Sequence, residues 1–353
     1  MATNEKPKLI VLVGMTGSGK TILKDKVIID ILRNDTNINP YVSVDDVFEQ
    51  NEDAKTVCYA IYSFLKGKSD KFYKKHINTN INVDTYLKII EKTKTIDKNC
   101  VLSQLKFKYQ YDPKKQHIIS ISKFISAVYF AFRRNGLDKE YDKSIQDAIK
   151  VKRNIIIESN GETPESIASW WNSPTNTKQD NTKCYKPSNV NVSNDLTGYE
   201  KHIVFISNEQ PCNIIYSIQS RLLNNIDEFL KYKNKGAPRL PEIDIVTINE
   251  KMDGIRQTFD YFNNNRDGIL IYHYINKPAA NNKKVTVDNL EKQKQKQTQT
   301  QLTNPYDNVS CTKPTGGKRR TRKNRKTRKK TARKYKKKAR SARRNRRRVS
   351  RKS

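Results

Sequence analysis

The chain has 353 residues, of which 35% are hydrophobic and 30% are charged, and its 70 Lys and Arg outnumber its 36 Asp and Glu. That length can bury the core of one large or two modest domains. Its apolar runs fall well short of the roughly 18 residues that a membrane-spanning helix requires, and its apolar start lacks a signal-peptide cleavage site. Five scattered cysteines and four histidines, with no CxxC pair, predict neither a disulfide framework nor a zinc site.

The positive charge is unevenly distributed. Residues 313–353 hold 24 Lys and Arg and no acidic residue, whereas residues 1–312 carry a net charge of only +10. We therefore expect a folded domain over residues 1–275, a polar low-complexity linker over 276–312 and a disordered basic tail over 313–353. Neither C-terminal segment can bury enough apolar surface to fold alone.

The first predicted element is a buried strand over Lys8–Val13, a continuous apolar run that ends at a glycine. Apolar residues at helical spacing predict a helix over Thr21–Arg33, and a second strand is predicted over Tyr41–Val44. Residues from about 53 to 152 are expected to form a helical insert, whose clearest helix spans Ile118–Arg134.

Strands and helices alternate in the rest of the folded part. The predicted elements are, in chain order, strand Asn154–Glu158, helix Pro164–Trp171, a polar loop over about 173–199, strand His202–Ser207, helix Pro211–Tyr232, helix Val246–Asn263 and strand Gly268–Tyr274. This alternation predicts an α/β fold in which helices flank a parallel sheet.

The segment GMTGSGKT matches the phosphate-binding pattern GxxxxGK[ST] and lies between the first predicted strand and the first predicted helix. Glycines let such a loop curl so that backbone N–H groups point at phosphate oxygens, and the following helix adds the positive end of its dipole. In this pattern Lys20 neutralises the β- and γ-phosphates and the Thr21 hydroxyl coordinates Mg²⁺. The predicted ATP–Mg²⁺ site consists of Gly14, Thr16, Gly17, Ser18, Gly19, Lys20 and Thr21.

Acidic residues follow two of the predicted strands. Asp45 and Asp46 come after Tyr41–Val44, and Glu158 ends Asn154–Glu158. All three are therefore expected at the carboxyl edge of the sheet, where open α/β sheets bind ligands. A carboxylate there can accept the proton of an attacking hydroxyl or hold Mg²⁺ through water. Position alone leaves open that Asp46 or Glu158 caps the following helix instead.

Two arginines are candidates to stabilise charge near a γ-phosphate. Arg221 lies in the predicted helix Pro211–Tyr232, and Arg239 lies in the loop Gly236-Ala-Pro-Arg-Leu-Pro. Taken alone, either arginine is better explained as a solvated surface residue, so a functional role depends on the whole set of motifs.

Taken together and in order, the segments GMTGSGKT, VSVDDVF, NIIIESNGET, SIQSR and GAPR resemble those of zeta-toxin-type P-loop kinases. The resemblance covers about residues 8–275 apart from two inserts, and beyond the generic first motif it depends on Asp46 with Phe48 and on Glu158 with Gly161. It implies a fold similar to adenylate-kinase-like and chloramphenicol-phosphotransferase-type enzymes. It also implies transfer of the ATP γ-phosphate to a hydroxyl, in known members on a UDP-linked amino sugar.

The resemblance also implies a role for each matching residue. Lys20 and Thr21 would hold ATP and Mg²⁺, Asp46 would be the general base, Glu158 would position the acceptor, and Arg221 and Arg239 would clamp the transferring phosphoryl group. The helical insert is longer than this family needs and occupies the region that shapes the acceptor pocket.

The basic tail predicts attraction to polyanions. Binding of nucleic acid through phosphates would be salt-sensitive and tolerant of sequence. Nuclear import or nucleolar retention explains such a run equally well, and a solubilising tail without a defined partner is a third possibility. The tail also resembles those on proteins of large DNA viruses. An intracellular, cytoplasmic protein is expected, to which the tail would add the nucleus or the virion as destinations.

The expected activity is Mg²⁺-dependent transfer of the ATP γ-phosphate to a hydroxyl of a small metabolite such as a UDP-amino sugar. Two alternatives stay open. One is a kinase for the 5′-hydroxyl ends of nucleic acids, to which the tail would deliver the substrate. The other is a non-enzymatic nucleic-acid-binding or virion protein whose P-loop is a retained nucleotide site.

Overall fold

The structure is a computed structural model, and it describes only part of the chain. The described residues are 6–68, 80–115, 117–168, 170, 196, 198–208, 224–232, 235–239, 245–276 and 290–292. The chain divides into two units, Met1–Cys311 and Thr312–Ser353. All described residues belong to the first unit, so the predicted tail over 313–353 lies outside them. Of the predicted helix Pro211–Tyr232, residues 211–223 also lie outside them, and residues 224–231 are helical.

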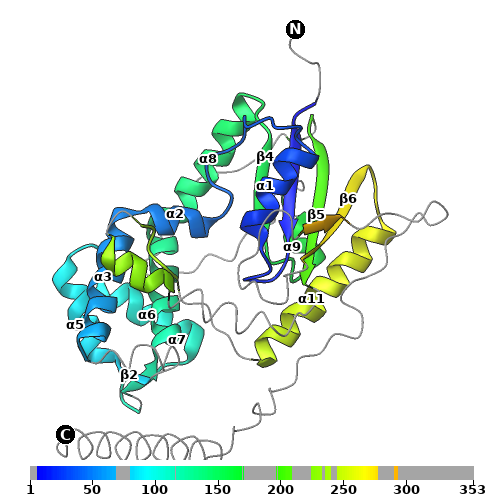
Figure 1. Ribbon diagram of the computed structural model, residues 1–353. Coiled ribbons are helices and arrows are strands. Elements are labelled where there is room, and N and C mark those ends of the chain that lie inside the picture. Colours follow the sequence, from blue (N-terminus) through cyan, green and yellow to red (C-terminus); the bar gives the residue numbers. More distant parts are fainter. Residues whose placement is uncertain are drawn as a thin grey trace, which may run out of the picture. The chain divides into compact units, whose positions relative to one another are not determined.

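The first unit contains a five-stranded sheet in the order β4-β1-β5-β6-β7 (Figure 1). Its strands are β1 (Lys8–Val13), β4 (Ile155–Ser159), β5 (Glu200–Asn208), β6 (Ile269–Asn276) and β7 (Leu290–Lys292). The first four strands are parallel to one another, and β7 is antiparallel to β6. The predicted α/β fold with a parallel sheet is confirmed.

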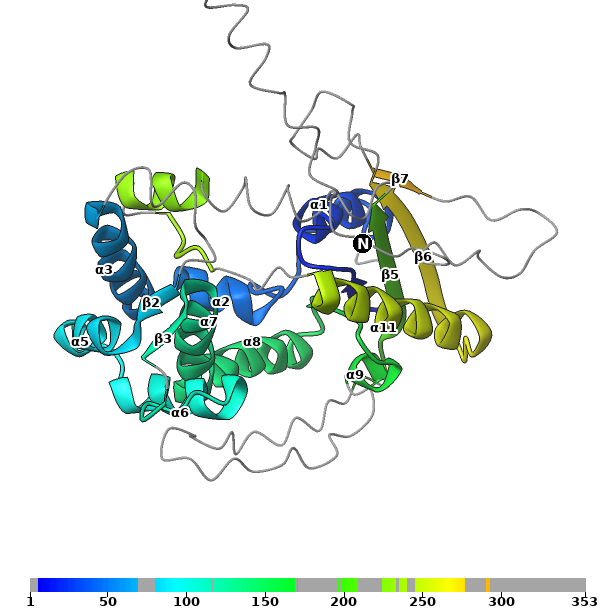
Figure 2. The ribbon, with the colours of Figure 1, turned by 90° about the horizontal axis from the view of Figure 1, so that it is seen from below.

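The sheet is covered on both faces, which explains why β1 is apolar throughout. Ile10 and Leu12 pack with Leu23 of helix α1 (Lys20–Asp30) on one face. The alternate residues of β1 belong to the core of the other face, which includes Phe259 of helix α11 (Ile245–Asn264). Figure 2 shows α1 and α11 on opposite sides of β5 and β6.

The described part of the insert is mostly helical, as predicted. Helix α2 (Val44–Gln50) precedes the insert, whose elements are α3 (Glu52–Lys68), β2 (Asn80–Asn82), α5 (Val83–Thr93), α6 (Lys98–Tyr109), β3 (Ile118–Ser120), α7 (Ile121–Phe132), a π-helical turn η1 (Arg133–Leu137) and α8 (Asp138–Lys150). The short helix α9 (Pro164–Ala168) follows β4. Buried residues of the insert and of one sheet face form a single core, so the insert packs against the sheet.

The predicted strand over Tyr41–Val44 is wrong. Ser43 is the N-cap of α2, and Asp46 accepts hydrogen bonds from the backbone N–H groups of Val42 and Ser43, both at 2.9 Å. These N–H groups are therefore not free for a strand ladder. The segment keeps one hydrogen bond to the sheet, in which the Glu158 N–H donates to the Val42 carbonyl at 2.8 Å.

Three further details differ from the sequence prediction. The helix expected from Ile118 begins at Ile121, because Ile118–Ser120 pairs with β2 and Ser120 caps α7. Strand β7 lies inside the segment expected to be a linker. Cys100 is disulfide-bonded although the cysteine spacing gave no sign of pairing, whereas Cys58 on α3 is a buried free thiol.

Gly161, in the turn after β4, lies against the strand that leads into the phosphate-binding loop. Its φ is +65°, and a Cβ atom there would lie 2.2 Å from Cγ1 of Val13. We expect Gly161→Ala to lower the free energy of unfolding by about 3 kcal/mol, because it combines a left-handed backbone with overpacking. Gly67→Ala is the control, since Gly67 lies on α3 with open space around it and the change should be neutral or stabilising. Denaturant unfolding measures both, and equal effects would contradict this explanation.

Asp142 on α8 gives the fold a pH dependence. Burial and the nearby charge of Asp138 raise the pKa of Asp142 from 3.8 to about 6, and Arg133 acts in the opposite direction. The folded state thus holds this proton more tightly than the unfolded chain, and the ionised form destabilises the fold increasingly between about pH 4 and pH 6.

Asp142→Asn should therefore raise the free energy of unfolding at pH 8. We expect a gain of about 1 kcal/mol, reduced by partial solvent screening, that disappears below about pH 4. Asp147→Asn, at an exposed position of the same helix, is the matched control. Denaturant unfolding from pH 4 to 8 tests this, and a gain that does not depend on pH would contradict it.

Candidate functional site

The phosphate-binding loop connects the carboxyl end of β1 to the first turn of α1. Gly17 and Gly19 have φ values of +82° and +104°, so the loop uses the left-handed conformation that glycine permits. The N–H of Ser18 donates to the Met15 carbonyl at 3.0 Å, and the N–H of Gly14 donates to the carbonyl of Ser159 at 3.3 Å. This is a curled loop at a helix N-terminus, the arrangement that suits a phosphate group.

Lys20, the first residue of α1, lies within this loop. Its side chain is buried, and Nζ donates to the carbonyl oxygens of Gly14 at 2.7 Å and Met15 at 3.2 Å. Burial lowers the pKa of Lys20, and the carboxylates of Glu158 and Asp45 act in the opposite direction. A buried ammonium held mainly by loop carbonyls is ready to exchange them for phosphate oxygens.

Two buried polar groups at the loop lack partners among the described residues. These are the Ser18 hydroxyl and the side-chain oxygen of Asn276. The Asn276 amide donates to the Ser18 carbonyl at 3.0 Å, so the last residue of β6 ties the loop to the sheet. Buried polar groups are nearly always hydrogen-bonded, and these two polar atoms are available to a polar ligand.

Asp46 belongs to the first turn of α2, where its carboxylate completes a capping box with Ser43. Oxygen Oδ2 accepts the two backbone hydrogen bonds, and Oδ1 has no hydrogen bond from the described part of the chain. Asp46 therefore does cap the start of α2, as the alternative interpretation predicts. It occupies one carboxylate oxygen and leaves the other available to an acceptor.

Glu158 lies at the carboxyl end of β4, opposite Leu12 of β1. Burial raises the pKa of Glu158, Lys20 opposes this shift, and the charges of Asp46 and Asp45 add to it. Glu158 and Asp45 thus lie near the buried Lys20, and Asp46 lies near Glu158. That concentration of charge near a phosphate-binding loop is typical of a site that handles Mg²⁺ and phosphate.

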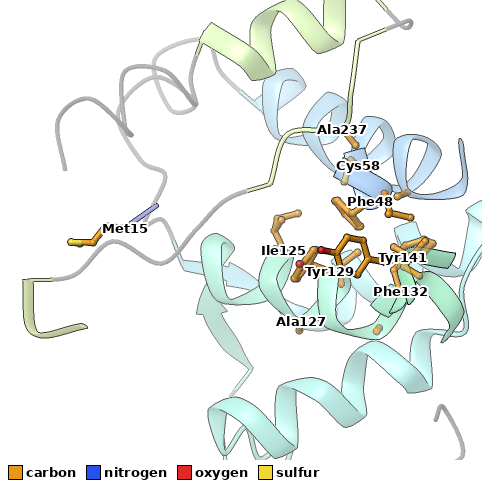
Figure 3. Close-up of a cluster of buried hydrophobic side chains, with 14 of the residues drawn as sticks. Met15, Phe48, Cys58, Ile125, Ala127, Tyr129, Phe132, Tyr141 and Ala237 are labelled. Carbon is orange, nitrogen blue, oxygen red and sulfur yellow. The ribbon is translucent and has the colours of Figure 1, made fainter. Parts of the chain in front are cut away.

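Arg239 reaches the same edge from the GAPR loop. Its guanidinium donates to Asp45 and lies 4.8 Å above the ring of Tyr129 on α7. The Tyr129 hydroxyl donates to the other oxygen of Asp45. Figure 3 shows Tyr129 beside the buried ring of Phe48, and the two ring centres are 5.1 Å apart.

The GAPR loop is itself held by α2 and by α3, the first helix of the insert. The N–H of Ala237 donates to the Glu49 carbonyl at 2.9 Å, and the Tyr62 hydroxyl donates to the Pro238 carbonyl at 2.7 Å. A Cβ atom on Gly236 would lie 3.1 Å from Cβ of Glu49, so the loop approaches α2 closely. These contacts fix the backbone position from which the Arg239 side chain extends.

The structure thus brings together the phosphate-binding loop, Asp46, Glu158 and Arg239. Arg221, the second predicted arginine, lies outside the described residues. Sequence reasoning placed Asp45 at this edge without giving it a role, and it missed Tyr129. Asp45 is the sequence neighbour of Asp46, and Tyr129 lies in an aromatic stretch whose pattern predicts core packing.

The residues present fit ATP with Mg²⁺. The curled loop, the buried Lys20 and the unpaired Ser18 hydroxyl suit phosphate oxygens, and Thr21 lies exposed in the first turn of α1, where a hydroxyl suits Mg²⁺. Among the described residues, no three His, Cys, Asp or Glu side chains cluster as a protein-only metal site would require. Within the same residues, no helix has the length and apolar character needed to span a membrane.

Comparison with protein-family models gives no match, and comparison with curated proteins gives none either. Among solved structures, a chain from the PezAT chromosomal toxin–antitoxin system of Streptococcus pneumoniae is similar over 76% of this chain and 69% of its own length. The sequence identity is 13% and the TM-score is 0.32. So low a TM-score carries no argument, and the fold assignment depends on the strand order and loop geometry of this chain.

Proposed function

We propose that the chain is an ATP- and Mg²⁺-dependent phosphotransferase that acts on a hydroxyl acceptor. The observation that carries the proposal is the gathering of Lys20, Glu158, Asp45 and Arg239 at the carboxyl edge of the sheet, beside a curled loop and a helix N-terminus. This edge is where parallel α/β sheets bind their ligands. Electrostatic stabilisation and positioning are what phosphoryl transfer requires of a protein.

Each side chain has a role in this proposal. ATP with Mg²⁺, when bound, supplies the transferable γ-phosphoryl group. Lys20 and the loop hold the phosphates, and Thr21 holds the metal ion. Asp46, through Oδ1, accepts the proton of the attacking hydroxyl, and Glu158 orients the acceptor. Arg239, together with Arg221 of the same motif set, stabilises charge on the transferring group.

The acceptor we propose first is a small metabolite such as a UDP-amino sugar. Its support is the resemblance of the motif order to zeta-toxin-type kinases, carried by Asp46, Phe48, Glu158 and Gly161. A 5′-hydroxyl end of nucleic acid is the second candidate, favoured by the 24 basic residues of 313–353.

The test is label transfer from γ-labelled ATP with Mg²⁺ to UDP-N-acetylglucosamine, to a 5′-hydroxyl oligonucleotide, or to water alone. We expect label on an acceptor with the full chain. Label on the sugar supports the first candidate, and label on the oligonucleotide supports the second. Tight ATP binding without label on any acceptor would favour a non-enzymatic nucleotide site.

A further inference from the structure

Basic and aromatic side chains alternate along the surface of α6 and α7. Lys123 Nζ lies 5.6 Å from the Tyr109 ring centre, and Lys108 Nζ lies 5.8 Å from Tyr109 and 3.5 Å from Phe130. The Arg133 guanidinium lies 5.7 Å from Phe130. We call these five residues, Lys123, Tyr109, Lys108, Phe130 and Arg133, the α6–α7 row.

The chain segment that carries the row is strongly basic. Residues 104–134 hold seven Lys and Arg against a single acid, Asp112. Lys108 and Lys123 are exposed, and Tyr109 and Phe130 are half-buried. Phe107, beside the row on α6, is 70% exposed, which is unusual for a phenylalanine in a folded protein. Basic groups therefore lie over aromatic faces that solvent reaches in part.

The row extends along α7 toward the candidate site. From Lys123 to Arg133 the chain rises along α7 and its following turn, which corresponds to roughly 15 Å at the helical rise per residue. Arg133 also lies 5.7 Å from the ring of Tyr129, whose hydroxyl donates to Asp45. One end of the row therefore meets the candidate site, although Arg133 is also paired with Asp138 at 2.8 Å.

We propose that the α6–α7 row binds single-stranded nucleic acid. Cations along the row attract backbone phosphates, and the exposed ring of Phe107 beside them can stack on an unpaired base, the combination that sequence-tolerant single-strand binding uses. A duplex offers no open base faces, and an acidic peptide would use the cations but not the rings. The inference goes beyond the proposed function, because binding along the row requires no phosphate transfer.

The test is photo-crosslinking of the full chain to a short single-stranded oligonucleotide that contains 4-thiouracil, without ATP, with mapping of the crosslinked peptides. We expect crosslinks on the peptides that hold Phe107, Tyr109 and Phe130. In the double variant Lys108→Gln, Lys123→Gln these crosslinks should fall by about ten-fold, and crosslinks to residues 313–353 should persist.

The matched control is the double variant Lys88→Gln, Lys92→Gln, which removes the same charge from exposed positions of α5. It should leave the crosslinks on the row unchanged. Crosslinks confined to 313–353, or an equal loss in both double variants, would overturn the proposal. Thermal unfolding of both variants excludes a folding defect. Because ATP is absent, the result is independent of whether the chain transfers phosphate.

Discussion

Replacing Lys20 with methionine is expected to reduce phosphate transfer by at least about 10³-fold and to weaken ATP binding. The methionine keeps most of the apolar stem but removes the ammonium that lies between the carbonyls of Gly14 and Met15. It also removes the cation that opposes the raised pKa of Glu158. Calorimetric titration with ATP and a transfer assay measure the two losses.

Lys24→Met is the matched control for this variant. Lys24 lies one turn further along α1, outside the loop, so the same change of side chain there should leave ATP binding unaltered. Thermal unfolding of both variants separates loss of function from loss of fold. An ATP affinity that is the same in Lys20→Met and in the wild type would show that the loop does not bind nucleotide in this way.

The second large effect is expected for Asp46→Asn, which should lower turnover by about 10²- to 10⁴-fold with little change in ATP affinity. The asparagine oxygen can still accept the backbone hydrogen bonds from Val42 and Ser43, so the start of α2 should be preserved. The amide cannot accept the proton of an attacking hydroxyl. Steady-state kinetics resolve this as a loss in kcat.

Ser43→Ala provides the opposite change at the same helix start. It removes the hydroxyl that accepts from the Asp46 N–H at 3.3 Å, at a loss of about 1 kcal/mol in stability, but it keeps the carboxylate. We expect Ser43→Ala to retain most of its turnover. If both variants lost activity equally, Asp46 would act through the shape of α2 and not as a base.

The strands of the sheet could be predicted because their signal is local. The four parallel strands are apolar runs, and β1 ends at the glycine of a recognisable motif. The error at Tyr41–Val44 arose because a capping box depends on side-chain to backbone hydrogen bonds, which hydropathy does not report. The short strand β7, with sequence Leu-Glu-Lys, exists only through its pairing with β6 and has no local signal.

The candidate site was predictable only in part for the same reason. The loop with Lys20 is a contiguous motif, and its place in the structure follows from the strand and the helix around it. The contact between Arg239 and Asp45 joins residues 194 positions apart in the chain. Neither residue lies in a sequence pattern that predicts its partner, and the sequence does not distinguish Tyr129 from the core residues around it.

The balance of products tests whether this site transfers phosphate to a hydroxyl and not to water. ³¹P NMR of the full chain with ATP, Mg²⁺ and the acceptor found by label transfer follows ADP, inorganic phosphate and phosphorylated acceptor together. We expect one phosphorylated acceptor for each ADP formed, and we expect Asp46→Asn to form almost none of either product. Inorganic phosphate equal to ADP, at a rate that Asp46→Asn leaves unchanged, would contradict this expectation.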